Sequence, residues 1–154
     1  MDCTDEPNVE TVFKSHKIDG VIHFAGLKAV GESVQYPLEY YYTNLLSTLV
    51  LCRQCQKHHV NNIIFSSSAT VYGEQTSPLK EEMKLEKTTN PYGETKAINE
   101  RILLDFAKAN QMVSVVLLRY FNPVGAHKSG LLGESPNGIP NNLMPYILKV
   151  ASKA

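Results

Sequence analysis

Three short apolar runs alternate with amphipathic segments along this chain, and that alternation constrains its fold more than any other feature. The runs cover residues 21–24, 62–66 and 113–118, and they are rich in valine and isoleucine. Each run is mostly apolar and does not alternate regularly between apolar and polar residues. Such runs are typical of strands buried on both faces, as in a parallel sheet.

The segments between the runs have the period of helices. After Pro37, apolar residues recur every three or four positions from Leu38 to Val50. A second helix is expected from Asn90-Pro91, a favourable N-cap and first-turn pair, and a short one after Pro7. Residues 125–140 are rich in glycine and proline, and a short helical tail follows them. Strands alternating with helices predict an α/β fold with a parallel sheet.

In open parallel sheets, ligands bind at the carboxyl ends of the strands. The chemistry is therefore expected at the residues that follow the three apolar runs. These residues are 26–28, 66–70 and 119–122.

The charge balance excludes some classes of partner. Fifteen basic residues oppose fifteen acidic ones, so no overall field attracts nucleic acid or an anionic membrane. None of the apolar runs is long enough to span a bilayer. The acidic segment 1–6 lacks the basic start and apolar stretch of a signal peptide, so a cytoplasmic protein is expected.

Cys52 and Cys55 form a C-x-x-C motif that is followed by His58 and His59. A structural zinc site draws on a second pair of ligands, and the chain offers no second C-x-x-C. A redox-active motif normally begins a helix, whereas this one falls near the end of a helical pattern. Cysteines on a helix face are therefore preferred over metal or redox chemistry, and no metal is expected.

Tyr92 and Lys96 are four residues apart at the start of the second predicted helix, so both project from one face. A nearby ammonium favours the phenolate of a tyrosine, which lets such a pair move protons near neutral pH. Alone, the pair would be interpreted as a surface contact between the two side chains. Ser66, Ser67 and Ser68 change this balance, because hydroxyls at the end of a strand can donate to a substrate, although they could also simply terminate the strand.

The strings 65–73 and 90–96 together resemble the extended branch of the short-chain dehydrogenase/reductase family. Within that branch the chain resembles the UDP-glucose 4-epimerases from Asp2 essentially to its end. The most specific strings are residues 21–33, 118–127 and 138–145. The resemblance implies the second half of a doubly wound, Rossmann-type parallel sheet plus the start of a substrate domain.

The resemblance also implies roles for individual residues. Tyr92 is expected to act as base and acid at the sugar 4-hydroxyl, with Ser68 bound to the same oxygen and Lys96 completing the catalytic set. The cofactor is expected to be NAD, contacted by Asp2, Cys3, Phe24, Ala25, Gly26, Leu27, Lys28, Asn44, Ser66, Tyr92, Lys96, Tyr120 and Phe121. UDP-glucose or UDP-galactose is expected at Lys28, Ser68, Tyr92, Asn122, Asn142 and Leu143. Without the resemblance, Lys28 reads as a solvated lysine and Asn142 as a helix N-cap.

Ala69 and Thr70 separate this chain from the related 4,6-dehydratases, which carry an acidic pair there to eliminate water. The Gly-rich turn that binds pyrophosphate in this family is expected upstream of Asp2, together with the first three strands. Residues 1–122 are thus expected to form a partial NAD-binding domain and residues 123–154 the beginning of a substrate-binding region. A homodimer is expected for the parent protein, and a non-catalytic fragment that associates with other chains is the alternative.

Overall fold

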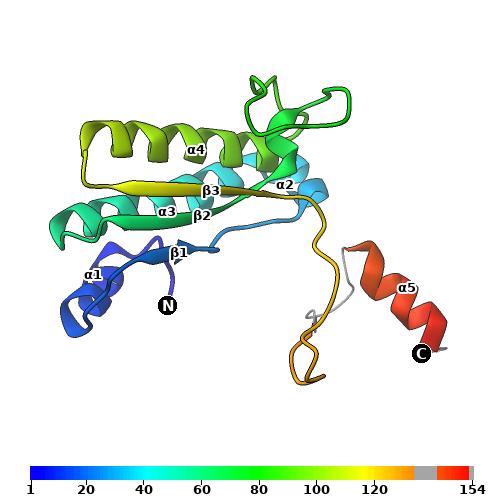
Figure 1. Ribbon diagram of the computed structural model, residues 1–154, viewed down its shortest axis with the longest axis horizontal. Helices are drawn as coiled ribbons and strands as arrows, with labels where there is room; N and C mark the ends of the chain where they lie inside the picture. The colour runs from blue at the N-terminus through cyan, green and yellow to red at the C-terminus, as the bar shows by residue number, and fades with distance from the viewer. Residues whose placement is uncertain (134–141, 153–154) are drawn as a thin grey trace. The chain divides into compact units, whose positions relative to one another are not determined.

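The computed structural model describes residues 1–133 and 142–152, which fall into two compact units, Met1–Tyr120 and Phe121–Ala154. The strands of the first unit are β1 (Val21–His23), β2 (Asn62–Ser68) and β3 (Ser114–Tyr120). Its helices are α1 (Glu6–Ser15), α2 (Val30–Gln35), α3 (Pro37–Lys57), the 3-10 helix η1 (Ala69–Tyr72) and α4 (Pro91–Ala109); α5 (Leu143–Ser152) belongs to the second unit (Figure 1). The expected NAD-binding and substrate-binding roles of the two parts stay predictions.

The three strands form one parallel sheet in the order β1-β2-β3. Phe65 in the middle of β2 lies opposite His23 on β1 and Leu117 on β3. At the carboxyl end, Ser68 lies opposite Tyr120. The α/β fold with a parallel sheet that the alternation predicts is therefore confirmed.

Strands β2 and β3 extend further than the apolar runs suggest, whereas β1 ends at His23. β2 continues through all three serines and β3 continues to Tyr120, so Ser66–Ser68 belong to the strand instead of following it. Two short elements, α2 and η1, were not predicted. With six and four residues, they are too short to display a helical period.

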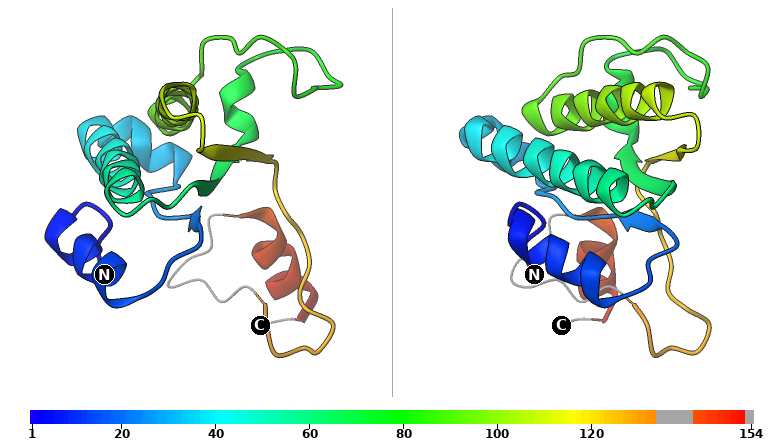
Figure 2. Two further views of the ribbon diagram at one scale, coloured as in Figure 1. Left: turned by 60° about the vertical axis from the view of Figure 1, so that its left-hand side comes forward. Right: turned by 90° about the vertical axis from the view of Figure 1, so that its left-hand side faces the viewer.

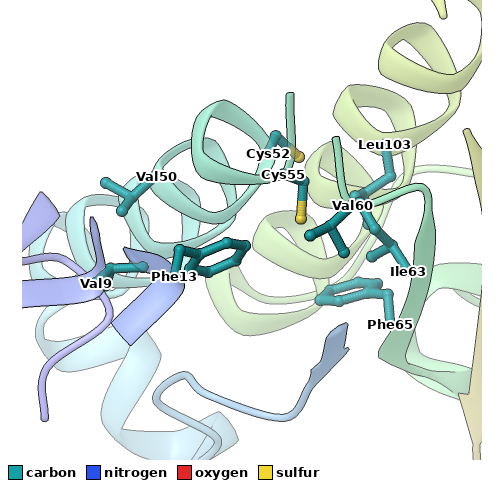
Figure 3. Close-up of a cluster of buried hydrophobic side chains, with 9 residues drawn as sticks. All are labelled: Val9, Phe13, Val50, Cys52, Cys55, Val60, Ile63, Phe65 and Leu103. Atoms are coloured by element: carbon teal, nitrogen blue, oxygen red, sulfur yellow. The ribbon is translucent and has the colours of Figure 1, made fainter. Parts of the chain in front are cut away.

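Helices α1, α3 and α4 lie on the same side of the sheet (Figure 2). Their buried side chains meet those of β2 in one apolar cluster (Figure 3), which consists of Val9, Phe13, Val50, Cys52, Cys55, Val60, Ile63, Phe65 and Leu103. On the sheet itself, Ile22 and Val116 remain exposed. The apolar cluster thus fixes the three helices to one face of the sheet.

Local signals in the sequence explain where the two long helices begin. Pro37 occupies the first turn of α3, and Pro91 that of α4, where the missing N–H costs nothing. Asn90 caps α4, because its side-chain oxygen accepts a hydrogen bond of 2.8 Å from the backbone N–H of Gly93. Neither helix, nor any other in the described residues, is long and apolar enough to cross a membrane.

Candidate active site

The carboxyl end of β2 and the first turns of α4 bring the three predicted catalytic residues into one region. Ser68 ends β2, and Tyr92 and Lys96 lie on successive turns of α4. The Asn90 cap places Tyr92 in the first turn of the helix. The motif identified in the sequence therefore lies at the edge of the sheet where parallel-sheet proteins bind ligands.

The hydroxyl of Ser68 is oriented by the turn that follows it. Its oxygen accepts hydrogen bonds from the backbone N–H of Thr70 at 3.3 Å and from the Thr70 hydroxyl at 3.0 Å. Both bonds use acceptor positions of the serine oxygen, which leaves its own proton available as a donor. Ser68 is therefore prepared to donate a hydrogen bond.

Gly93 allows the start of α4 to approach this turn closely. A Cβ atom at this position would lie 3.2 Å from both Cβ and Oγ1 of Thr70. That spacing is tight, so a larger residue would push α4 away from η1. The absence of a side chain at Gly93 thus keeps its neighbour Tyr92 close to the Ser68 turn.

Lys96 is almost fully buried, with 6% of its surface exposed. Its ammonium donates a 2.7 Å hydrogen bond to the backbone oxygen of Ser66, and it lies 5.8 Å from the centre of the Tyr92 ring. Burial lowers the pKa of Lys96 to about 8. The alternative of a surface contact between Tyr92 and Lys96 is therefore wrong, because the lysine is inside the protein.

Asn44 connects the loop after β1 to both long helices. Its side chain accepts from the Leu27 N–H at 2.8 Å and donates to the Leu27 oxygen and the Thr95 hydroxyl, each at 3.0 Å. Its backbone oxygen accepts from Asn99 at 3.0 Å. Gly26 is required beside it, since a Cβ atom there would lie 2.9 Å from the Asn44 oxygen and its φ is +148°.

Several of the predicted cofactor residues line one cavity of about 410 Å³ in this unit. Its walls are Met1, Asp2, Cys3, Thr4, Ala25, Gly26, Leu27, Thr43 and Ser47. Phe24 and Lys28 are exposed residues of the same loop, outside that lining. Five of the predicted cofactor-binding residues therefore line this cavity: Asp2, Cys3, Ala25, Gly26 and Leu27. Thr43 and Ser47 of α3 line it as well.

The remaining predicted residues follow β3. Tyr120 ends that strand directly opposite Ser68. Phe121, Asn122, Asn142 and Leu143 belong to the second unit and are all exposed within it. The preceding residues 138–141 of the family-like string lie outside the described residues.

Sequence reasoning missed His23, which is buried beneath the site. Its Nε2 lies 3.0 Å from the Thr48 hydroxyl, and burial together with the Lys96 ammonium lowers its pKa to about 4. The imidazole is therefore neutral at physiological pH. Its position within an apolar run was the only signal in the sequence, and that signal also fits an ordinary core residue.

Sequence reasoning also missed Glu100, although its spacing from Tyr92 and Lys96 could have identified it. It lies four residues after Lys96 and eight after Tyr92, on the same helix face. Only 1% of its surface is exposed, which is rare for a glutamate without a partner. Its partner is Arg119 on β3, with Nη2 and Oε2 separated by 2.8 Å.

Cys52 and Cys55 are buried free thiols within the apolar cluster. Burial raises the pKa of Cys52 to about 11 and that of Cys55 to about 12. Thiols with raised pKa values are poor nucleophiles at neutral pH, which supports a packing role over redox chemistry. Among residues 1–133 and 142–152, no cluster of three metal-ligating side chains is present.

Comparison with known families and proteins gives a consistent result. The whole chain, residues 1–154, matches the NAD dependent epimerase/dehydratase family. It is 57% identical over 153 residues to a UDP-glucose 4-epimerase of Caenorhabditis elegans and 58% identical over 151 residues to one of Bacillus subtilis. These alignments cover 98% and 97% of this chain but 44% of each relative, so the chain spans less than half the length of the curated relatives it matches.

Solved structures agree with the sequence relatives. The UDP-glucose 4-epimerase of Bifidobacterium longum in complex with NAD+ and UDP is 59% identical, with a TM-score of 0.94 over 99% of this chain and 46% of that protein. The Stenotrophomonas maltophila protein with bound NAD and formylated UDP-arabinopyranose is 45% identical, with a TM-score of 0.92.

Proposed function

The chain belongs to the NAD dependent epimerase/dehydratase family, and from that premise we propose that the protein interconverts UDP-glucose and UDP-galactose at the 4-position of the sugar. The single observation that carries this proposal is the grouping of Ser68, Tyr92 and Lys96 at the carboxyl edge of β2. The names of its relatives support the choice of substrate.

Tyr92 moves the proton at the sugar 4-hydroxyl. As a phenolate it removes the hydroxyl proton while C4 is oxidised, and as a phenol it returns the proton when C4 is reduced from the opposite face. Lys96 supports the phenolate by its positive charge, because an ammonium nearby lowers the free energy of an anion. The 2.7 Å bond to the Ser66 oxygen holds the ammonium in place.

Ser68 holds the same sugar oxygen. Its acceptor positions are used by Thr70, so its proton points to a new acceptor, and the sugar 4-oxygen fits that requirement. A hydrogen bond to this oxygen stabilises the negative charge that develops when the proton leaves. Ser68 and Tyr92 therefore act on one atom.

The residues of the first unit fit part of a dinucleotide site. The cavity of about 410 Å³ is bounded by the loop after β1, where Gly26 brings the backbone close to Asn44, and it is flanked by Asp2 and Cys3. When bound, NAD supplies the acceptor for the hydride of C4 and gives the hydride back. Lys96, Tyr120 and Phe121 would complete the contacts near the nicotinamide, and Asn122, Asn142 and Leu143 those of the UDP-sugar.

Epimerisation is favoured over dehydration by the residues after Ser68. Elimination of water from the sugar needs an additional acid and base, whereas Ala69 has no ionisable group and the Thr70 hydroxyl is bonded to Ser68. Oxidation and reduction at C4 need only one proton-transferring residue. The chain therefore carries the proton-transferring residue that epimerisation requires and lacks, at these two positions, the acid and base that dehydration adds.

The protein is also proposed to form a homodimer through the outer faces of α3 and α4. On α3, Leu38, Tyr42 and Leu49 lie at helical spacing and are exposed, and Leu104 is exposed on α4. An exposed apolar stripe of this kind is typical of an interface between symmetric copies. Leu49→Asp is expected to give monomers in sedimentation, and a monomeric wild-type protein at micromolar concentration contradicts the proposal.

The reaction is tested by isotope retention. UDP-galactose labelled with deuterium at C4 is incubated with the protein, and the UDP-glucose formed is examined by NMR. Retention of the label at C4 is expected, because the same hydride leaves and returns. Loss of deuterium to water, or a dehydrated product, contradicts the proposal.

A further inference from the structure

A buried ion pair outside the catalytic set joins α4 to both strands beside the site. Glu100 Oε1 accepts a 2.5 Å hydrogen bond from the Ser67 hydroxyl and a 3.0 Å bond from Arg119 Nε. Glu100 Oε2 accepts from Arg119 Nη2 at 2.8 Å. Ser67 and Arg119 are opposite each other on β2 and β3, so one carboxylate bridges two adjacent strands.

Arg119 extends this connection to the segment after Ser68. Its Nη1 lies 3.0 Å from the backbone oxygen of Glu81 and 3.3 Å from the Tyr72 hydroxyl, and its guanidinium stacks 5.0 Å from the Tyr72 ring centre. The hydrogen bonds to Glu100 raise the pKa of Arg119, so the guanidinium keeps its charge at any working pH. The Arg119 side chain therefore contacts three segments: η1, the loop that follows η1, and α4.

The contacts between α4 and β2 occur in sequence order along both elements. On α4, Tyr92, Lys96 and Glu100 occupy successive turns of one face. On β2, Lys96 binds the backbone of Ser66 and Glu100 binds the side chain of Ser67, while Ser68 follows directly. Two neighbouring turns of the helix are therefore fixed to two neighbouring residues of the strand.

We propose that Glu100 and Arg119 are positioning residues. They fix the position of α4 along the direction of β2, and this position determines where Tyr92 and Lys96 lie relative to Ser68. This inference rests on the proposed function for its catalytic readout. A purely stabilising role explains the pair poorly, since well-packed apolar residues usually stabilise as well as a buried ion pair. Catalysis does need such precision, because a displacement of about 1 Å can lower a rate by a factor on the order of a hundred.

The test compares Glu100→Gln with Leu103→Ala in the intact protein. Leu103 is equally buried on α4, three residues further on, and belongs to the apolar cluster. With UDP-galactose, Glu100→Gln is expected to lower kcat about tenfold or more and to leave KM within about twofold. Leu103→Ala is expected to lower the melting temperature by at least as much while kcat, measured well below melting, stays within about twofold.

A second variant and a second measurement keep the test decisive. Ser67→Ala retains the ion pair and is expected to lower kcat severalfold; it decides the question if Glu100→Gln does not fold. Amide hydrogen exchange, which needs no turnover, is expected to increase selectively at residues 69–73 and 92–96 in Glu100→Gln, and throughout α4 in Leu103→Ala.

The outcomes separate this inference from the proposed function. If the wild-type protein does not convert UDP-galactose, the proposed function fails and hydrogen exchange alone decides whether the pair positions the start of α4. If the wild type is active but Glu100→Gln and Ser67→Ala keep wild-type kcat, the positioning role is overturned. It is equally overturned if exchange rises uniformly in Glu100→Gln, as in the Leu103→Ala control.

Discussion

The two ends of the α3–α4 layer differ in the kind of residue that they mostly bury. Towards the end of both helices, most of the buried side chains are apolar, among them Val50 and Leu103, although Gln54 is buried there too. Towards their beginning, most of the buried side chains are polar, among them Asn44 and Lys96. The same two helices and the same strand β2 contribute to both ends.

On the proposed function, this difference separates an end shaped by folding from an end shaped by chemistry. Apolar burial stabilises a fold wherever it occurs, so the apolar end needs no further explanation. A buried polar group costs free energy unless it is hydrogen-bonded. At the polar end, the network around Asn44 and the contact between Lys96 and Ser66 supply those bonds. On the proposed function, the polar end serves the chemistry, and each substitution below is chosen to separate the two ends.

The largest expected effect is at Lys96. In Lys96→Met, turnover of UDP-galactose should fall by a factor on the order of a hundred or more, because the charge that supports the Tyr92 phenolate is gone. The melting temperature should stay equal or rise, because a buried cation is replaced by an apolar side chain of similar length. Kinetics and thermal melts of the same preparation measure both.

Lys108→Met is the matched control for that substitution, since Lys108 is an exposed lysine of the same helix. Both its turnover and its melting temperature should remain at wild-type values. A Lys96→Met protein that melts much earlier than wild type contradicts the contrast between the two ends, because Lys96 would then hold the fold together.

Leu103→Ala makes the opposite change at the apolar end. The side chain is buried in the apolar cluster, so its truncation should lower the free energy of unfolding by about 3 kcal/mol, through lost burial and a residual cavity. Urea denaturation measures this loss. Turnover well below the melting temperature should change less than twofold. A large loss of kcat in a folded Leu103→Ala variant contradicts the contrast, because the apolar end would then contribute to catalysis as well as to stability.

The effect expected at His23 depends on pH. Its pKa is about 4 in the folded protein and about 6.5 when unfolded, so between these values only the unfolded chain takes up the proton. Stability should therefore fall as the pH drops from about 6.5 to 4, by roughly 3 kcal/mol in all, and this contribution should be fully present above pH 6.5.

His23→Gln removes that titration and can still donate to Thr48. Urea denaturation at pH 7 and pH 5 should therefore show a smaller loss of stability in this variant than in the wild type. His16→Gln, at an exposed histidine, serves as the control and should behave as the wild type. Identical pH dependence in all three proteins shows that His23 is not the buried neutral base described above.

The apolar end was the easier one to predict from the sequence. The apolar cluster follows from the apolar runs and helical periods, and the start of α4 follows from the Asn90-Pro91 cap; all of these are local signals. The motif of Tyr92 and Lys96 was also visible, because their spacing places them on one helix face. The ends of β2 and β3 were missed, since Ser66–Ser68 and Arg119 do not continue the apolar pattern although they pair in the sheet.

The polar end depends on contacts between residues far apart in the sequence. Glu100 meets Arg119 only because β3 lies beside β2, and Asn44 meets Thr95 only because α3 packs on α4. Local patterns carry no information about such pairings. The residues of the second unit, including Asn122 and Asn142, were assigned by resemblance, and their proposed contacts with the UDP-sugar remain to be measured.

The most direct test of the central claim is the turnover of UDP-galactose by Tyr92→Phe, compared with Tyr36→Phe at the exposed N-cap of α3. Each substitution removes one hydroxyl and keeps the ring. Tyr92→Phe should lose activity by a factor on the order of a hundred or more with little change in UDP-sugar binding, because only proton transfer is removed. Tyr36→Phe should stay near wild type, and a Tyr92→Phe protein that also turns over near wild-type rates contradicts the account.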